Sequence, residues 1–154
     1  MPDLQRIADE LAIRAVGAAY ADACNRLCPE DVVASFAPDG TMGRAGGPVV
    51  PAEKLLKNYR NVLGSCAFLF QTLHSAVIVI DGDRAKARWW FAEILRRQGE
   101  DDWRMNLGLY DDEMVRLGGG WRFASRRFTL RKSLSLGPQG DGEPPPAYVQ
   151  LLAG

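Results

Sequence analysis

The sequence predicts an α+β domain in which three helices from the first half of the chain pack on a curved antiparallel sheet from the second half. Two observations lead to this fold class. Apolar residues recur at helical spacing in stretches up to about residue 63, whereas residues 68–132 are long apolar and β-branched runs separated by short turns. The chain has 154 residues, 47% hydrophobic and 25% charged, which is typical of one globular domain.

The first helix is expected from Leu4 to about Leu27, where a helical apolar repeat runs without a proline. Pro29 ends this helix and begins a short second one over residues 30–36, because proline is tolerated in a first turn. Residues 41–50 are rich in glycine and are expected to hold a short, irregular strand pair. A third helix follows Pro51, with an apolar face made of Leu55, Leu56, Tyr59, Val62 and Leu63.

The second half is expected to form two long hairpins. The first joins residues 68–80 to residues 84–97 through Asp81-Gly82, a strong hairpin-turn signal, and the second joins 103–117 to 121–132 through three glycines. The domain is expected to cover residues 1–136. Residues 137–154 are rich in glycine and proline and form a tail that is either disordered or docked as an extended arm, and its apolar end favours docking.

Composition argues against several classes of function. The 19 basic and 19 acidic residues give a net charge of zero, which removes the usual electrostatic basis for binding nucleic acid or an anionic membrane. The sequence shows neither a long apolar span nor a secretion signal, so a cytoplasmic protein is expected. Three cysteines are too few for a disulfide framework, and Cys24, Cys28 and the single histidine His74 are not spaced as a metal site, so neither metal nor cofactor is expected.

The order of elements resembles the SnoaL-like branch of the NTF2-like superfamily, whose fold is a cystatin-like cone around a deep pocket. The resemblance is carried by residues 20–25 (YADACN), 36–40 (FAPDG), His74, 80–85 (IDGDRA), 110–116 (YDDEMVR) and 120–127 (GWRFASRR). It implies a pocket for a small, mostly apolar molecule. It leaves the activity open, because this fold hosts scytalone dehydratase, ketosteroid isomerases, epoxide hydrolases, polyketide cyclases, a dehydrochlorinase and non-enzymatic transport factors.

In the dehydratase and dehydrochlorinase members, a carboxylate near the end of the first helix works with a histidine from the strand after the third helix. The resemblance identifies His74 as this histidine. Asn25, however, stands where many relatives carry aspartate, and an amide cannot relay a proton at neutral pH. Asp22, three residues earlier on the same side of the helix, is a candidate replacement.

Two further charged residues are candidates for the pocket. Glu93 interrupts an apolar run and shares a strand face with Trp89 and Phe91, so its carboxylate must be paired, protonated or facing a cavity. The alternative is a rim residue paired with an arginine. The resemblance points Arg126 toward the pocket, and the alternative for it is a surface charge in a basic stripe with Arg127.

The leading hypothesis is a cofactor-free lyase or isomerase that transfers a proton on a hydrophobic cyclic or polyketide-like substrate. Its catalytic residues are expected to be His74, Glu93 and Arg126, pointing into one cavity between the sheet and the first helix. Substrate-binding residues are expected to be Tyr20, Asp22, Asn25, Trp89, Phe91, Asn106 and Tyr110, although each aromatic residue also suits an ordinary core.

Two other hypotheses remain open. The first is a non-catalytic ligand-binding or subunit module, which Asn25 favours. The second is epoxide-hydrolase chemistry, in which Asp22 and Glu93 would flank Arg126. Either way a homo-oligomer, dimer or trimer, is expected to form through the outer face of the sheet, as the resemblance implies.

Overall fold

The structure is a computed structural model and describes residues 3–140. The described residues include the three expected helices, α1 (Leu4–Asn25), α2 (Pro29–Ala34) and α3 (Ala52–Gly64). Asp3 caps α1 by accepting a hydrogen bond from the Arg6 backbone N–H at 3.1 Å. Within residues 3–140, none of the helices is both long and apolar enough to span a membrane.

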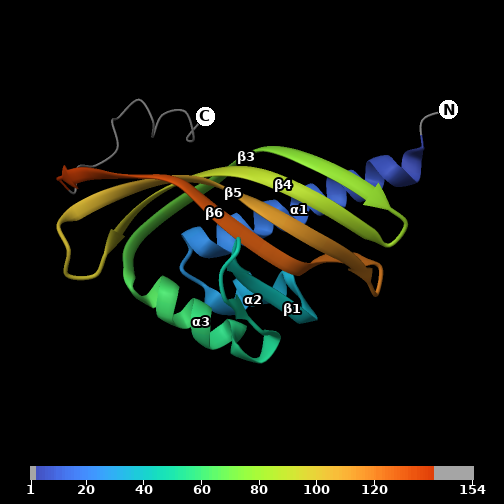
Figure 1. The fold of residues 1–154 in the computed structure, drawn as a ribbon, viewed down its shortest axis with the longest axis horizontal. Helices are drawn as coiled ribbons and strands as arrows, with labels where there is room; N and C mark the ends of the chain where they lie inside the picture. Colours follow the sequence, from blue (N-terminus) through green and yellow to red (C-terminus); the bar gives the residue numbers. More distant parts are fainter. Residues whose placement is uncertain (1–2, 141–154) are drawn as a thin grey trace, which may run out of the picture.

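Six strands form one curved sheet in the order β2-β1-β6-β5-β4-β3. Their bounds are β1 (Phe36–Arg44), β2 (Val49–Val50), β3 (Cys66–Asp81), β4 (Arg84–Arg97), β5 (Asp102–Leu117) and β6 (Gly120–Pro138). The four long strands arch over α2, α3 and β1, with α1 lying along the sheet (Figure 1). The α+β fold is therefore as expected, with one difference: β1 pairs with β6 in parallel, so the sheet is mixed.

Several boundaries differ from the sequence-based expectation. Helix α2 ends at Ala34 and β1 already begins at Phe36, whereas a helix to residue 36 and strands from residue 41 were expected. The first hairpin turns at Gly82-Asp83, one residue later than expected, because Asp81 pairs with Arg84 and Gly82 adopts the left-handed φ of 57° that glycine tolerates. Strand β6 continues to Pro138, so the first two residues of the expected tail belong to the sheet. The proposed docking of the tail concerns mainly residues 141–154, which lie outside the described residues.

The inner face of the sheet is buried against the helices. Its core side chains include Trp89, Phe91, Met114 and Phe123. Helix α1 approaches the sheet closely because Gly17 has no side chain: a Cβ there would lie 2.8 Å from the Trp89 ring. The missing side chain at position 17 thus allows α1 to pack closely on the Trp89 ring.

The outer face of the sheet has two halves of different character. Around Arg88 and Asp111, which form an ion pair at 2.6 Å, the cross-strand neighbours are mostly charged. Toward the other end lie five large apolar side chains that are 37–48% exposed, here named the outer apolar patch: Phe68, Phe70, Trp90, Leu107 and Leu134. Exposed large apolar side chains gathered on one face make the patch a candidate contact surface.

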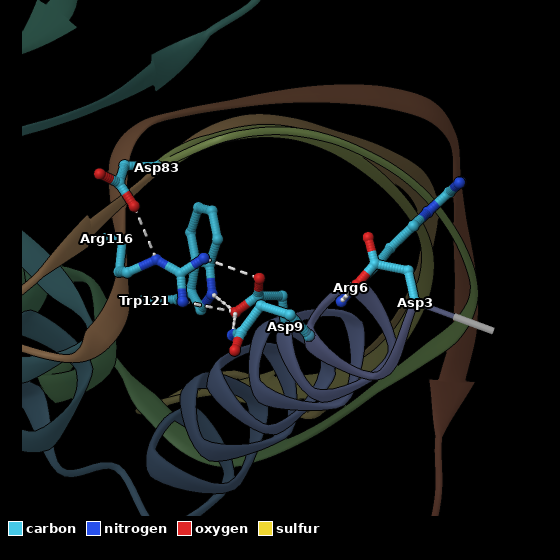
Figure 2. Close-up of polar contacts among 7 residues, drawn as sticks. Asp3, Arg6, Asp9, Asp83, Arg116 and Trp121 are labelled. Atoms are coloured by element: carbon cyan, nitrogen blue, oxygen red, sulfur yellow. Dashed lines mark hydrogen bonds and ion pairs between the residues drawn. The ribbon is translucent and has the colours of Figure 1, made fainter. Parts of the chain in front are cut away.

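A buried carboxylate ties the start of α1 to both hairpin turns (Figure 2). Asp9 accepts hydrogen bonds from the two Nη atoms of Arg116 at 2.6 and 2.7 Å and from Trp121 Nε1 at 3.1 Å. Arg116 also donates to Asp83 at 2.9 Å, and its guanidinium lies 4.8 Å from the centre of the Trp121 ring. The hydrogen bonds from Arg116 hold the pKa of Asp9 below its usual value of 3.8.

We expect Asp9→Asn to lower the melting temperature by several degrees, because the amide presents an N–H group to the Arg116 donors. Since the folded-state pKa is lowered, the stability contributed by Asp9 is complete above 3.8 and is lost as the pH falls through the folded-state value. Thermal unfolding of the parent protein and of Asp9→Asn between about pH 3 and 7 measures the deficit in melting temperature. The deficit should be constant near neutrality and shrink in acid. Asp83→Asn, which alters the exposed partner of Arg116, is the matched control, and an equal effect of both would contradict the assignment.

Candidate functional site

A cavity of about 470 Å³ lies between the inner face of the sheet, the end of α1, helix α3 and strand β1. This volume suits a drug-sized molecule. Its walls are mainly apolar and include Leu63, Leu69, Phe91, Leu95 and Phe128. A larger hollow of about 750 Å³ lies over the charged half of the outer face, but it is more open and two of its charged side chains, Arg88 and Asp111, pair with each other. We therefore place the candidate site in the cavity on the inner face, which is the less open of the two.

The inner end of the cavity carries a row of three polar side chains on adjacent strands. Gln71, Glu93 and Asn106 are direct cross-strand partners on β3, β4 and β5, so their side chains share the inner face. Gln71 Nε2 donates to one oxygen of Glu93 at 3.0 Å, and Asn106 Nδ2 donates to the other at 2.8 Å. The two amides hold the carboxylate in a fixed orientation.

Three tyrosines supply hydroxyl groups beside this row. Tyr110 Oη accepts a hydrogen bond from Gln71 Nε2 at 3.0 Å, which leaves its own proton free to donate. Tyr20 and Tyr59 hydroxyls lie 3.1 Å apart. Burial raises the pKa of all three phenols above the usual value of 10.0. They are therefore neutral hydrogen-bond donors at physiological pH.

Arg126 is fully buried behind the tyrosines and does not line the cavity. Its Nε and Nη2 atoms donate to the two oxygens of Asp112 at 2.9 and 2.8 Å. The guanidinium carbon lies 4.1, 4.0 and 4.1 Å from the ring centres of Tyr20, Tyr110 and Phe123. Arg126 is thus neither a surface charge nor a cavity-lining residue. It supports the tyrosines from behind.

His74 lies outside the cavity. Its ring is exposed, it contacts Thr72 Oγ1 at 3.5 Å, and it lines a surface groove with Arg14 and Asp22. The strand register shifts between Leu73 and Ala76, and the inward-facing polar residue of β3 is Gln71. The expectation that His74, Glu93 and Arg126 point into one cavity is therefore corrected: of the three, Glu93 alone lines it.

Asn25 also has a different place from the one expected for a substrate-binding residue. Its Nδ2 donates to the Gln71 carbonyl at 2.9 Å, and its Oδ1 accepts from the Gln71 backbone N–H at 2.6 Å. Strand β3 is an edge strand, so Asn25 satisfies backbone groups that lack a neighbouring strand. Aspartate could accept from the N–H group but could not donate to the carbonyl. An amide at position 25 is therefore explained by its two hydrogen bonds to the backbone of Gln71.

The remaining predicted binding residues divide into two groups. Tyr20, Phe91, Asn106 and Tyr110 line the cavity. Asp22 is exposed and pairs with Arg26 at 2.8 Å, and Trp89 packs under α1 against Gly17, so these two do not line it. Gln71 and Tyr59 were not identified from the sequence. Gln71 could have been identified from the sequence, because it is a polar residue two positions from Leu69 in an alternating apolar strand and so shares its face.

Among the described residues, histidine, cysteine and carboxylate side chains form no group of three or more that could hold a metal ion. The polar atoms of the cavity are amide, carboxylate, hydroxyl and thiol groups, with guanidinium groups at its mouth. This set can hydrogen-bond a substrate and move a proton.

Fold and cavity together define a cone-shaped α+β domain in which the candidate site lies between the curved sheet and the helices. The family model of the SnoaL-like domain matches residues 5–127, and the chain belongs to that family.

Solved structures are similar in fold. A candidate scytalone dehydratase from Novosphingobium aromaticivorans is 19% identical over 90% of this chain and 97% of its own, with a TM-score of 0.78. A hexachlorocyclohexane dehydrochlorinase from Novosphingobium barchaimii is 16% identical over 94% of this chain and 100% of its own, with a TM-score of 0.80. No curated protein matches the chain by sequence. At these identities the likeness concerns the fold.

The Arg126–Asp112 pair generates a stability prediction. Arg126→Met leaves the Asp112 carboxylate buried without its partner, and we expect it to lower the free energy of unfolding by about 3–5 kcal/mol. Adding Asp112→Leu removes the unpaired charge and should recover most of the loss. Equilibrium denaturation measures both. Arg88→Met, in the exposed pair with the adjacent Asp111, is the control and should change stability little. A double variant no more stable than Arg126→Met would contradict this account.

Proposed function

We propose that the protein is a cofactor-free lyase or isomerase that transfers a proton on a small hydrophobic substrate bearing an oxygen, of cyclic or polyketide-like type. The observation that carries the proposal is the carboxylate of Glu93, held on both oxygens by amide donors inside an apolar cavity. Membership of the SnoaL-like family agrees with it, and so does the fold shared with structures described as a dehydratase and a dehydrochlorinase.

In the proposed reaction Glu93 is the general base. It takes a proton from a carbon next to the substrate carbonyl, and the C–H electron pair forms an enolate. The neutral hydroxyl of Tyr110, and that of Tyr20 or Tyr59, donates a hydrogen bond to the enolate oxygen. Protonated Glu93 then returns the proton to a second carbon, which gives isomerisation, or to a hydroxyl group that leaves as water, which gives dehydration.

The amides on either side of Glu93 are positioning residues in this scheme. Gln71 and Asn106 fix the carboxylate, and Asn25 fixes the backbone of Gln71. The arrangement replaces an Asp–His pair with a carboxylate from the sheet.

A non-catalytic ligand-binding module is the second candidate. The observation that favours it is the missing dyad: Asn25 is occupied by backbone groups and His74 lies outside the cavity. In that case the polar row would bind a ligand without turnover. A proton-transfer assay separates the two candidates.

We expect Glu93→Gln to reduce proton transfer at least about 100-fold, because the amide is not a base. The measurement is exchange of the α-hydrogens of 2-tetralone, an apolar cyclic ketone, followed by NMR in D₂O. His74→Ala, a substitution outside the cavity, is the control and should stay within about threefold of the parent. Exchange by Glu93→Gln within the same threefold range would refute the role of Glu93.

The same exchange assay tests the effect of having asparagine instead of aspartate at position 25. Asn25→Asp should lower the exchange rate, because a carboxylate facing the Gln71 carbonyl disturbs the residue that orients Glu93. A higher rate would instead indicate that a dyad at the helix end is the better catalyst in this fold.

We also propose that the protein works in the cytoplasm as a homo-oligomer, most simply a dimer, joined through the outer apolar patch. The three cysteines are free thiols, which fits a reducing compartment. The patch has the large exposed apolar side chains that are typical of the centre of a protein–protein interface.

Sedimentation velocity at micromolar concentration tests the oligomer. The parent protein should sediment as an oligomer, and Trp90→Glu should dissociate it by placing a charge in the patch. Val79→Glu is the matched control, because Val79 is also exposed on the outer face but lies in the charged half opposite Lys86. A monomeric parent protein is the result that contradicts the proposal.

A further inference from the structure

The mouth of the cavity carries charge that the proposed reaction does not use. Two arginines line the cavity and are exposed: Arg44 at the end of β1 and Arg97 at the end of β4. Strands β5 and β6 lie between β1 and β4 in the sheet, so the two cations reach the mouth from separate strands. Exposed Pro48, Val62 and Leu130 complete the rim, whereas Tyr20, Gln71 and Tyr110 at the inner end are buried.

Neither arginine forms an ion pair within residues 3–140, although seven other arginines there do. Arg97 Nη1 donates to Ser65 Oγ at 2.6 Å. The Arg44 guanidinium lies 5.2 Å from the centre of the Phe128 ring, another lining residue. These contacts orient the guanidinium groups without neutralising them. Glu93, the one carboxylate among the described lining residues, lies in the row at the inner end.

The inner end of the cavity offers a hydrogen-bond acceptor instead of a cation. Gln71 and Asn106 hold the Glu93 carboxylate there through one donor each. A carboxylate oxygen accepts more than one hydrogen bond, so Glu93 can also accept from a hydroxyl or N–H group of a ligand. The wall between the two ends is apolar, with Leu69, Leu95 and Phe128.

From these three zones we propose that the ligand of this cavity is an amphipathic anion. Its apolar ring or chain lies along the apolar wall, its anionic group lies between Arg44 and Arg97 at the mouth, and a hydroxyl or N–H group at its other end donates to the Glu93 carboxylate. Guanidinium groups bind carboxylates and related anions through paired N–H donors, which makes an organic acid the best match for the mouth. The proposal names the substrate class for the proposed function, but it rests on the cavity rather than on turnover.

Two fluorescent probes with one skeleton test the proposal. 1-Anilinonaphthalene-8-sulfonate and N-phenyl-1-naphthylamine share an apolar N-phenylnaphthylamine body, and only the first carries an anion. Fluorescence titration should show the parent protein binding the sulfonate at least about tenfold more tightly than the neutral probe. The double variant Arg44→Gln, Arg97→Gln should bind the two probes within about twofold of each other.

Arg96→Gln is the matched control, because Arg96 neighbours Arg97 in sequence but does not line the cavity, and it should keep the parent preference. Leu95→Phe, which fills the cavity, should weaken both probes and so shows where they bind. Equal affinities in the parent, a preference that persists in the double variant, or probe binding that ignores Leu95→Phe would each overturn the proposal. The readout is binding without turnover, so failure of the Glu93 assay and failure of this one are distinguishable.

Discussion

The cavity depends on one buried ion pair. Asp112 on β5 and Arg126 on β6 are cross-strand partners, and both side chains are fully buried. A buried guanidinium is tolerable only when it is paired and enclosed, so the aromatic rings of Tyr20, Tyr110 and Phe123 must close around it. Because these rings come from α1, β5 and β6, the pair fixes the helix relative to the sheet. It thereby fixes the position of two cavity-lining tyrosines.

The position of Tyr110 in turn determines the positions of the side chains in the polar row of Gln71, Glu93 and Asn106. The Tyr110 hydroxyl accepts from Gln71, whose side chain also donates to Glu93, and Asn25 holds the Gln71 backbone from the end of α1. Each of these residues satisfies another, which is how an apolar cavity can keep a carboxylate in one orientation. The geometry of the candidate base therefore follows from packing that begins at a residue outside the cavity.

The fold was predictable from the sequence to a greater extent than the site. Helical spacing in residues 4–63 and the hairpin turns at Gly82 and Gly118 are local signals, and both survive in the structure. The parallel pairing of β1 with β6 joins segments about 85 residues apart and has no local signal. For the site, alternation correctly placed Glu93 and Phe91. It could not place His74, because the register shift in β3 after Leu73 is invisible in the sequence. Nor could it pair Arg126 with Asp112, since that pairing depends on the register between two strands.

Position 25 shows how the hydrogen-bonding needs of the backbone can decide which element supplies the carboxylate of the site. The end of α1 meets the edge of β3, where a backbone N–H and a carbonyl both need partners, and an amide supplies both an acceptor and a donor. An aspartate would satisfy only one of them. With the amide committed at the helix end, the carboxylate that faces the cavity comes from β4 instead, in register with amides on both neighbouring strands. A carboxylate anchored in the sheet is held by cross-strand hydrogen bonds rather than by the helix end. Its position relative to the arginines at the mouth is therefore set by the strands alone, and the same strands align both ends of any ligand that enters.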